Sequence, residues 1–426
     1  MSSSTSRSTE LLYLDNSATT RVSEEVALKM QEAMLRTWGN PSSLHTAGQE
    51  AAALCDRARS DVLRALGAPW TTMTDRRSLI FTASGSEANN LAILGCAAAK
   101  ERNRRLRLIV SDSEHPSVLQ CAEKLEKEGY DVYRLKTRDG VLHADDIAQA
   151  LEKEPFLVSC MLVNNETGAR YDVESLFAQA KAKYPKCTTH TDAVQGFLHV
   201  PFRVPSLGAD LVTVSGHKIH GPKGIGALYV SPAALRAKAI SPVILGGGQE
   251  NGFRSGTENV PGIVGIGAAA SHCPDHGAQT AFREAVLQNL PQGVRANIPQ
   301  GKTAPHILSL TLPDIRSETM LHFLNSRGIA VSSGSACSSH AAHGSYVLRA
   351  FGLPDSEADT TIRVSTDEGV TADDAVRFLA ALREGVQELK LKDPKGGKIY
   401  ELKLTSLAFS MLYTAQVHGD YSPQPD

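Results

Sequence analysis

The stretch Ser215-Gly216-His217-Lys218-Ile219-His220-Gly221-Pro222-Lys223-Gly224-Ile225-Gly226 places a lysine on a polar turn directly after an apolar run. Residues 211–214 predict a buried strand and residues 225–230 a second one, because both runs are short, apolar and bounded by turn residues. Lys218 therefore lies where a strand ends and the backbone must turn. Lysine is the amine that forms Schiff bases with carbonyl cofactors. A solvated loop lysine is the alternative that this stretch alone leaves open.

Further units of the same kind, a predicted strand followed by a polar turn, precede this stretch. The strands are residues 79–81, 108–110, 156–163 and 188–191, and the turns after them carry Gly85, Ser86, His115, Asn165, Asp192 and Gln195. In an open α/β sheet the carboxyl ends of parallel strands meet at one edge, where ligands bind. We therefore predict that these polar residues share one site with Lys218.

The first of these turns also predicts the start of a helix. Ser84 and Glu87 have the spacing of a capping box, which places Gly85 and Ser86 in the first helical turn. A helix N-terminus offers backbone N–H groups and the positive end of the helix dipole to a phosphate. An ordinary capped helix without a ligand is the alternative.

The polar residues at the strand ends have the chemistry of a pyridoxal phosphate site. Asp192 can pair with the pyridinium nitrogen and keep it protonated, which makes the ring an electron sink. His115 can stack on the ring, and Asn165 or Gln195 can contact its phenolic oxygen. Each residue alone also fits a simple turn. The combination of an acid, a stacking ring and a lysine in one strand-end pattern predicts the site.

Length and composition predict a soluble protein of the cytoplasm. A chain of 426 residues has room for one large α/β core and a smaller domain. The net charge of -2, without a basic block, argues against nucleic acid or a membrane surface as the main partner. No apolar run approaches the roughly 20 residues of a membrane span, and the serine-rich start lacks an apolar signal core. The seven cysteines are scattered and odd in number, which is typical of reduced thiols.

Cys337 differs from the other cysteines because it lies in the small-residue stretch Ser332-Ser333-Gly334-Ser335-Ala336-Cys337-Ser338-Ser339. Such a stretch predicts an exposed, mobile loop, in which a deprotonated thiol can act as a nucleophile. An incidental loop cysteine is one alternative. A metal site with His340 and His343 is another, but structural zinc sites use four ligands, usually in two separated pairs, so we predict no metal.

The chain resembles the cysteine desulfurases of the NifS/IscS type, in the class V group of fold type I pyridoxal phosphate enzymes. The resemblance rests on the motifs above and on residues 14–20, 39–43, 246–250, 254–259, 345–349 and 361–365, and it covers residues 12 to about 385. It implies an α/β fold, with a mostly parallel seven-stranded sheet in a large domain at residues 15–263. A smaller α+β domain is expected from residues 1–14 and 264–390, followed by an extension at residues 391–426.

By this resemblance, Lys218 holds pyridoxal 5'-phosphate covalently and acts as the general base. Cys337 is the nucleophile that takes the sulfur of L-cysteine as a persulfide, while L-alanine is released. His115 stacks on the ring and moves a proton to or from the substrate thiol. Arg363 clamps the substrate carboxylate in a bidentate geometry, with Asn165 beside it.

The resemblance also implies the remaining cofactor contacts and the partners. The contacts are Gly85, Ser86, Asn165, Asp192, Gln195, Ser215, His217 and Thr257. Thr257 matches a threonine that reaches the phosphate of another subunit, which implies a homodimer. A sulfur-acceptor protein is expected, in iron–sulfur cluster or thio-cofactor biosynthesis, but the sequence does not name it.

Alternative functions remain open at this stage. A selenocysteine lyase acting on L-selenocysteine shares nearly every motif, and a class V aminotransferase would not need Cys337. A non-catalytic scaffold for sulfur transfer is a third alternative. The sequence departs from the family pattern in residues 270–303, which are fewer than expected, and after residue 390, where a linker and an apolar stripe at residues 402–412 follow.

Overall fold

The computed structural model describes residues 11–100, 107–333 and 345–389. These residues all lie in one compact unit. No helix in this part of the chain is long and apolar enough to cross a membrane.

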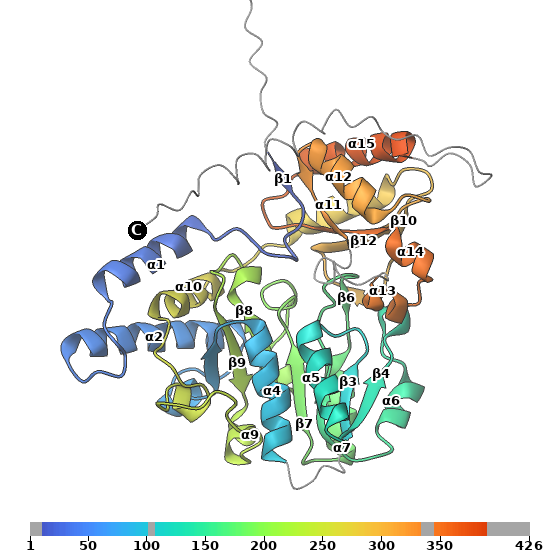
Figure 1. The fold of residues 1–426 in the computed structure, drawn as a ribbon. Coiled ribbons are helices and arrows are strands. Elements are labelled where there is room, and N and C mark those ends of the chain that lie inside the picture. Colours follow the sequence, from blue (N-terminus) through green and yellow to red (C-terminus); the bar gives the residue numbers. More distant parts are fainter. Residues whose placement is uncertain (1–10, 101–106, 334–344, 390–426) are drawn as a thin grey trace, which may run out of the picture. The chain divides into compact units, whose positions relative to one another are not determined.

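A seven-stranded sheet forms the centre of the larger part of the fold (Figure 1). Its strands, in spatial order, are β2 (Leu79–Thr82), β9 (Gly226–Val230), β8 (Leu211–Ser215), β7 (Thr188–Asp192), β5 (Pro155–Ser159), β3 (Arg107–Ser111) and β4 (Asp131–Leu135). Only β9 runs antiparallel to its neighbours in this sheet, so the predicted mostly parallel sheet is confirmed. The central strands are fully buried because helices cover both of their faces; β8 and β5 are mostly apolar, whereas β7 is polar in sequence, TTHTD.

Helices pack on the two faces of this sheet according to the alternation of side chains along each strand. Ile80 and Leu108 face the core formed with α4 (Gly85–Ala99) and α5 (Pro116–Lys127). Their neighbours along the strands, Leu79 before Ile80 and Ile109 after Leu108, belong to the core on the opposite face. The helices of that core are α2 (Thr46–Ala65), α7 (Val173–Lys183), α8 (Val204–Leu207) and α10 (Val260–Ala270), and α1 (Glu24–Arg36) packs on α10.

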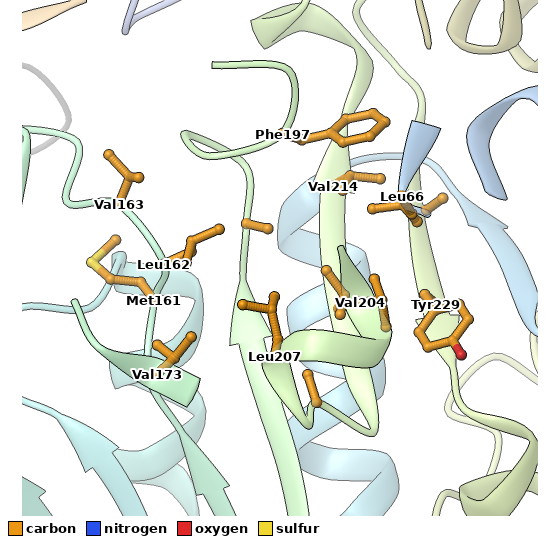
Figure 2. Close-up of a cluster of buried hydrophobic side chains, with 14 of the residues drawn as sticks. Leu66, Met161, Leu162, Val163, Val173, Phe197, Val204, Leu207, Val214 and Tyr229 are labelled. Atoms are coloured by element: carbon orange, nitrogen blue, oxygen red, sulfur yellow. The ribbon is translucent and has the colours of Figure 1, made fainter. Parts of the chain in front are cut away.

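The predicted strand at residues 156–163 is shorter in the structure, where β5 ends at Ser159. The reason is that the Glu114 carboxylate accepts the backbone N–H of Met161 at 2.6 Å, which ends the pairing with β3. Residues 161–163 remain buried in the core shown in Figure 2, between β7 and α7. They therefore serve as core residues beneath the end of the sheet.

A four-stranded sheet forms a second layer and is antiparallel throughout. Its order is β10 (Arg295–Ala296), β12 (Ile307–Thr311), β15 (Thr361–Ser365) and β14 (Ser332–Ser333). The helices α11 (Gly277–Gln288), α12 (Ser317–Ser326) and α15 (Ala372–Leu389) bury a separate apolar cluster against it. Residues 270–303, where the sequence departs from the family pattern, thus contribute the helix α11 and the edge strand β10 to this layer.

Short elements complete the part of the chain that the structure describes. They are β1 (Leu12–Tyr13) paired with β13 (Ile329–Ala330), β6 (Ala169–Arg170) paired with β11 (Lys302–Thr303), and the helices α3 (Met73–Arg76), α6 (Ala144–Ala150), α9 (Pro232–Arg236), α13 (Tyr346–Phe351) and α14 (Asp355–Asp359). Single 3₁₀ turns occur at Arg138–Gly140, Gly216–Lys218 and Glu250–Gly252. The predicted division into residues 15–263 and residues 1–14 with 264–390 stays a prediction.

Candidate active site

A cavity of about 350 Å³ lies where strands of the large sheet end. Of the residues predicted from the sequence, it is lined by Gly85, Ser86, His115, Asn165, Asp192, Gln195, Ser215, His217, Lys218 and Arg363. All but Arg363 lie at the ends of β2, β3, β5, β7 and β8 or in the turns that follow them, whereas Arg363 comes from β15 of the other sheet. The structure therefore brings these residues together at the carboxyl edge of the sheet.

Lys218 lies on the 3₁₀ turn after β8 and points at the N-terminal segment. Its Nζ donates to the carbonyl oxygens of Ser17, at 2.5 Å, and Ala18, at 2.8 Å. Gln195 Nε2 donates to the same Ser17 carbonyl at 2.9 Å. The main chain is held as well, because His199 Nε2 lies 2.8 Å from the Lys218 carbonyl oxygen. The Lys218 amine is thus held at one wall of the cavity by the carbonyls of Ser17 and Ala18, and the Lys218 main chain is held by His199.

His199 is supported in turn by a stacked partner. Its ring lies 4.2 Å from the ring of His306, with 22° between the planes. Burial lowers the pKa of His199 to about 4 and that of His306 well below its usual value. Both rings are therefore neutral at physiological pH, and they form an uncharged support behind the lysine turn.

Asp192 and His115 are joined by hydrogen bonds through two residues that the sequence analysis did not assign. Asn89 Nδ2 donates to Asp192 Oδ2 at 2.7 Å and to Ser117 Oγ at 2.9 Å. Ser117 Oγ lies 2.8 Å from His115 Nδ1. Burial lowers the pKa of His115, the Asp192 charge opposes this shift, and Lys218 adds to it. The acid and the ring predicted to contact the cofactor therefore belong to one connected set.

One end of the cavity has the features of a phosphate site. The N-terminus of α4 opens into it, with the Ser84 side chain capping Glu87 N–H as predicted. The return bond differs from the predicted capping box, because Glu87 accepts from Ala83 N–H and not from Ser84. A Cβ atom at Gly85 would lie 3.0 Å from a Val194 methyl group and 3.3 Å from Ser215 Cβ, so a larger residue would force these neighbours to shift.

Side chains beside this helix end complete the same region. The buried Ser215 Oγ has no hydrogen-bond partner among the described residues, which leaves a hydroxyl for a ligand. His217 Nδ1 lies 3.2 Å from Thr19 Oγ1. Burial lowers the pKa of His217 to about 4, with smaller contributions from the charges of Lys218 and Lys223. These donors, with the helix N-terminus, fit an oxyanion such as phosphate.

Arg363 offers one free edge to an anion. Its side chain is 5% exposed, and it donates from Nη2 to Asp15 Oδ1 and from Nη1 to the Asn165 carbonyl oxygen, both at 2.9 Å. Its buried Nε has no partner in the described part of the chain. The guanidinium is thus fixed in orientation, and its remaining N–H groups fit a carboxylate.

Two buried acids beside the cavity were also missed in the sequence analysis. Burial raises the pKa of Glu114 to about 8 and that of Glu166 to about 7. Glu166 accepts from Ser345 Oγ at 2.5 Å, and the Glu114 carbonyl oxygen accepts from Tyr346 Oη at 2.6 Å. These contacts attach the start of α13 to the rim of the cavity.

The missed residues carried weak local signals. Asn89 lies four positions after Gly85, so helical periodicity alone could have placed both on the face of α4 that lines the cavity. Ser117 lies in the first turn of the helix that begins at Pro116. Glu166 directly follows Asn165, which was assigned, in the turn at residues 164–168. No local signal pointed to Asp15 as the partner of Arg363.

Two predicted residues do not lie in this cavity as described. Thr257 lines a separate cavity of about 190 Å³, together with Glu250 and Arg254. Its predicted role toward a second subunit stays a prediction. Cys337 lies outside the described residues, as do His340 and His343. The predicted nucleophile therefore also stays a prediction.

Comparison with known proteins gives one consistent result. The Aminotransferase class-V family model matches residues 12–378. Cysteine desulfurase 2 of Trichormus variabilis is 36% identical over 392 residues, which cover 90% of this chain and 95% of that protein. A solved NifS-like protein has a TM-score of 0.80 and 32% identity, with 88% of this chain and 99% of that chain covered. A solved structure of SspA in complex with cysteine has a TM-score of 0.74 and 32% identity, with 84% and 100% covered. The chain therefore belongs to the class-V aminotransferase family, in the group of its cysteine desulfurases and NifS-like proteins.

Proposed function

We propose that this chain is a pyridoxal phosphate-dependent cysteine desulfurase, which converts L-cysteine to L-alanine and transfers the sulfur to Cys337. The observation that carries the proposal is the cavity that holds an amine, an acid and a guanidinium, from Lys218, Asp192 and Arg363. The names of the related proteins support the same reaction, and SspA was solved with cysteine bound. An amino acid substrate fits because the cavity presents a fixed cation to a carboxylate.

The residues of the cavity fit pyridoxal 5'-phosphate. Ser86 in the first turn of α4, with Ser215 at the end of β8 and His217 in the turn after it, would hold the phosphate, and the Ser215 hydroxyl, unpartnered among the described residues, supports this assignment. Asp192 would pair with the ring nitrogen, His115 would stack on the ring, and Gln195 would contact the phenolic oxygen. Lys218 would supply the amine that holds the aldehyde carbon.

The reaction then follows from the positions of these side chains. The bound cofactor supplies a protonated ring that takes up negative charge from the substrate carbon. Arg363 and Asn165 would hold the substrate carboxylate in the cavity that Lys218 also lines. The Lys218 amine would remove the proton from the substrate α-carbon and later return one to the product.

The thiolate of Cys337 accepts the sulfur of the substrate. This thiolate forms a bond to the substrate sulfur as the carbon–sulfur bond breaks, and the electron pair of the broken bond stays on the carbon, which takes up a proton. The products are a Cys337 persulfide and alanine, so atoms and electrons balance without another reactant. The neighbouring segments support this role: Ser332 pairs in register with Arg363, and Ser345 is bonded to Glu166.

The proposal is tested by incubating the reconstituted protein with L-cysteine and a dithiol. We expect sulfide and alanine in equal amounts, and mass spectrometry without the dithiol should find one added sulfur on Cys337. Cys337→Ser should abolish sulfide release, whereas the buried Cys187→Ser serves as the matched control. Transamination products formed without alanine would identify an aminotransferase. Turnover of L-selenocysteine but not of L-cysteine would identify a selenocysteine lyase.

We also propose a homodimer with shared sites. The exposed apolar side chains of Trp38, Leu44 and Leu245, which are 75%, 90% and 78% exposed in the single chain, support burial in an interface. Thr257 lies on the loop that follows Leu245. Sedimentation analysis showing a fully active monomer would contradict the shared site.

A cytoplasmic location and an acceptor protein for the sulfur complete the proposal. The free thiols of the six described cysteines fit a reducing compartment.

A further inference from the structure

We propose that Asn89 and Ser117 are positioning residues that fix the tautomer of His115, with the proton on Nε2. His115 then presents a hydrogen-bond donor, and not an acceptor, to the cavity. The inference deepens the proposed function, on which it rests for the identity of the group that faces Nε2. The tautomer itself follows from contacts within the chain.

The argument begins at Asp192, whose two carboxylate oxygens both accept hydrogen bonds. Oδ1 accepts from the backbone N–H of Val194 at 2.9 Å, and Oδ2 is 2.7 Å from the Asn89 amide. A carboxylate that faces an amide requires its nitrogen, so Nδ2 of Asn89 faces Asp192. Asn89 is 1% exposed, which leaves its amide no solvent alternative.

The second hydrogen of the same amide nitrogen determines the direction of the next bond. Asn89 Nδ2 donates to Ser117 Oγ at 2.9 Å, so this oxygen accepts there and keeps its own proton for another partner. The nearest ring nitrogen is Nδ1 of His115, at 2.8 Å. Ser117 therefore donates to His115.

A second contact imposes the same state on Nδ1. His115 is the N-cap of α5, and Nδ1 accepts the backbone N–H of Ser117 at 3.2 Å, a longer contact than the 2.8 Å to the hydroxyl. A nitrogen that faces both donors has to present its lone pair, whereas the longer backbone contact alone favours this state less strongly. The positive end of the helix dipole also disfavours a proton at this position. The proton of the neutral ring therefore lies on Nε2.

The charged groups around the ring agree with a neutral state. Burial and the Lys218 charge lower the pKa of His115, and the Asp192 charge raises it. Burial lowers the pKa of the neighbouring His217 to about 4, so His217 adds no positive charge near the ring at neutral pH. The ring therefore donates to a group in the cavity through Nε2. The Asn89 amide, which donates to Ser117 Oγ, keeps the Ser117 hydroxyl proton directed at His115 Nδ1.

The test uses the holoenzyme labelled with ¹⁵N at histidine. Long-range ¹H–¹⁵N spectra distinguish protonated from unprotonated ring nitrogens, and a His115→Gln sample identifies the His115 signals by difference. We expect an unprotonated Nδ1 and a protonated Nε2 in the wild type. A protonated Nδ1 would overturn the inference. Because the readout is the tautomer, a protein that releases no sulfide from cysteine would refute the proposed function and leave this result standing.

Variants of the two positioning residues extend the test. Ser117→Ala and Asn89→Ala should each give a mixture of tautomers and lower kcat by about tenfold or more, with KM for L-cysteine nearly unchanged. Ser117→Thr keeps the hydroxyl and should restore both the spectrum and kcat. Asn90→Ala is the matched control on the same helix, because the side chain of Asn90 donates to the backbone carbonyl of Ser86 one turn earlier and takes no part in the bonds between Asp192 and His115. A Ser117→Ala protein with the wild-type tautomer and kcat would contradict the proposal.

Discussion

Arg363 is the residue that we propose to bind the carboxylate of the substrate, and its guanidinium is fixed by Asp15 and by the Asn165 carbonyl. Arg363→Lys should raise KM for L-cysteine by about 30-fold or more, since loss of a charged pair of this kind costs about 2–5 kcal/mol. A lysine reproduces the charge but not the planar, bidentate geometry. Steady-state kinetics measure the change, and the absorption spectrum of the bound cofactor should stay the same. An unchanged KM would assign the carboxylate to another residue.

Lys218 is the second residue whose replacement has a specific expected result. Lys218→Ala should still bind pyridoxal phosphate through the phosphate and ring contacts but lose the covalent link and all turnover, because the general base is removed. Borohydride reduction followed by mass spectrometry should then fix no cofactor on the chain. Lys223→Ala, in the same turn but exposed, is the matched control and should keep both properties. Fixation of the cofactor on the Lys218→Ala protein would contradict the assignment.

Among the elements, the loop that carries Thr257 is held to the large sheet by a buried ion pair. Arg59 of α2 donates twice to the Glu250 carboxylate, at 2.8 Å for each bond, and Glu250 also accepts the backbone N–H of Phe81 at 2.9 Å. Removal of one partner leaves the other charge buried and unpaired. The loop position therefore depends on contacts with residues far away in the sequence.

We expect Glu250→Ala to lower the free energy of unfolding by about 3–5 kcal/mol, because Arg59 is left uncompensated. Urea denaturation followed by circular dichroism measures the change. The exposed pair between Glu25 and Lys29, at 2.6 Å, provides the control, and Glu25→Ala should leave the midpoint unchanged. Equal effects of the two substitutions would show that the buried pair does not hold the loop.

The same distinction between local and distant contacts explains what could be predicted from the sequence. The two strands beside Lys218 and the turn between them could be predicted, because an apolar run followed by glycine and polar residues is a local pattern. The end of β5 was predicted wrongly, because a side chain of another segment, Glu114, takes the N–H of Met161. Asn89 was not assigned, because its partner Asp192 lies 103 positions away.

At the scale of the whole molecule, buried histidines and carboxyls make stability depend on pH in opposite directions. Burial lowers the pKa of His190 to about 3 and that of His199 to about 4, and it lowers that of His306 well below the usual value of 6.5. Below pH 6.5 the unfolded chain binds these protons and the folded chain does not. Each histidine therefore removes up to about 1.4 kcal/mol of stability per pH unit between 6.5 and its folded pKa.

Glu114 and Glu166 act at the alkaline side. Their folded pKa values, about 8 and about 7, lie above the usual 4.5, so the folded chain keeps protons that the unfolded chain has lost. The stability that they contribute is complete below pH 4.5 and is lost as the pH rises through 7 to 8. Between pH 4.5 and 6.5 the stability gained from the three histidines as the pH rises exceeds the stability lost from the two carboxyls. These groups together therefore predict maximal stability near pH 6.5.

Thermal unfolding from pH 5 to pH 9 tests this prediction. Glu114→Gln should reduce the loss of stability above pH 7, because a neutral amide oxygen can still accept the bonds from Ser111 Oγ and Met161 N–H. Glu318→Gln, at the start of α12 and exposed, is the control and should follow the wild-type curve. A melting temperature that is flat across this range would contradict the assigned protonation states.

The contact between Asp15 and Arg363 has a consequence for biosynthesis, because the two residues stand 348 positions apart. A growing polypeptide that has left the ribosome only as far as β9 already contains the lysine turn and the strands beside it. It still lacks the arginine and the strand that carries it. An incomplete translation product therefore lacks the guanidinium that we propose to bind the substrate carboxylate. The order of synthesis thus delays completion of the proposed site until the chain has been made as far as β15.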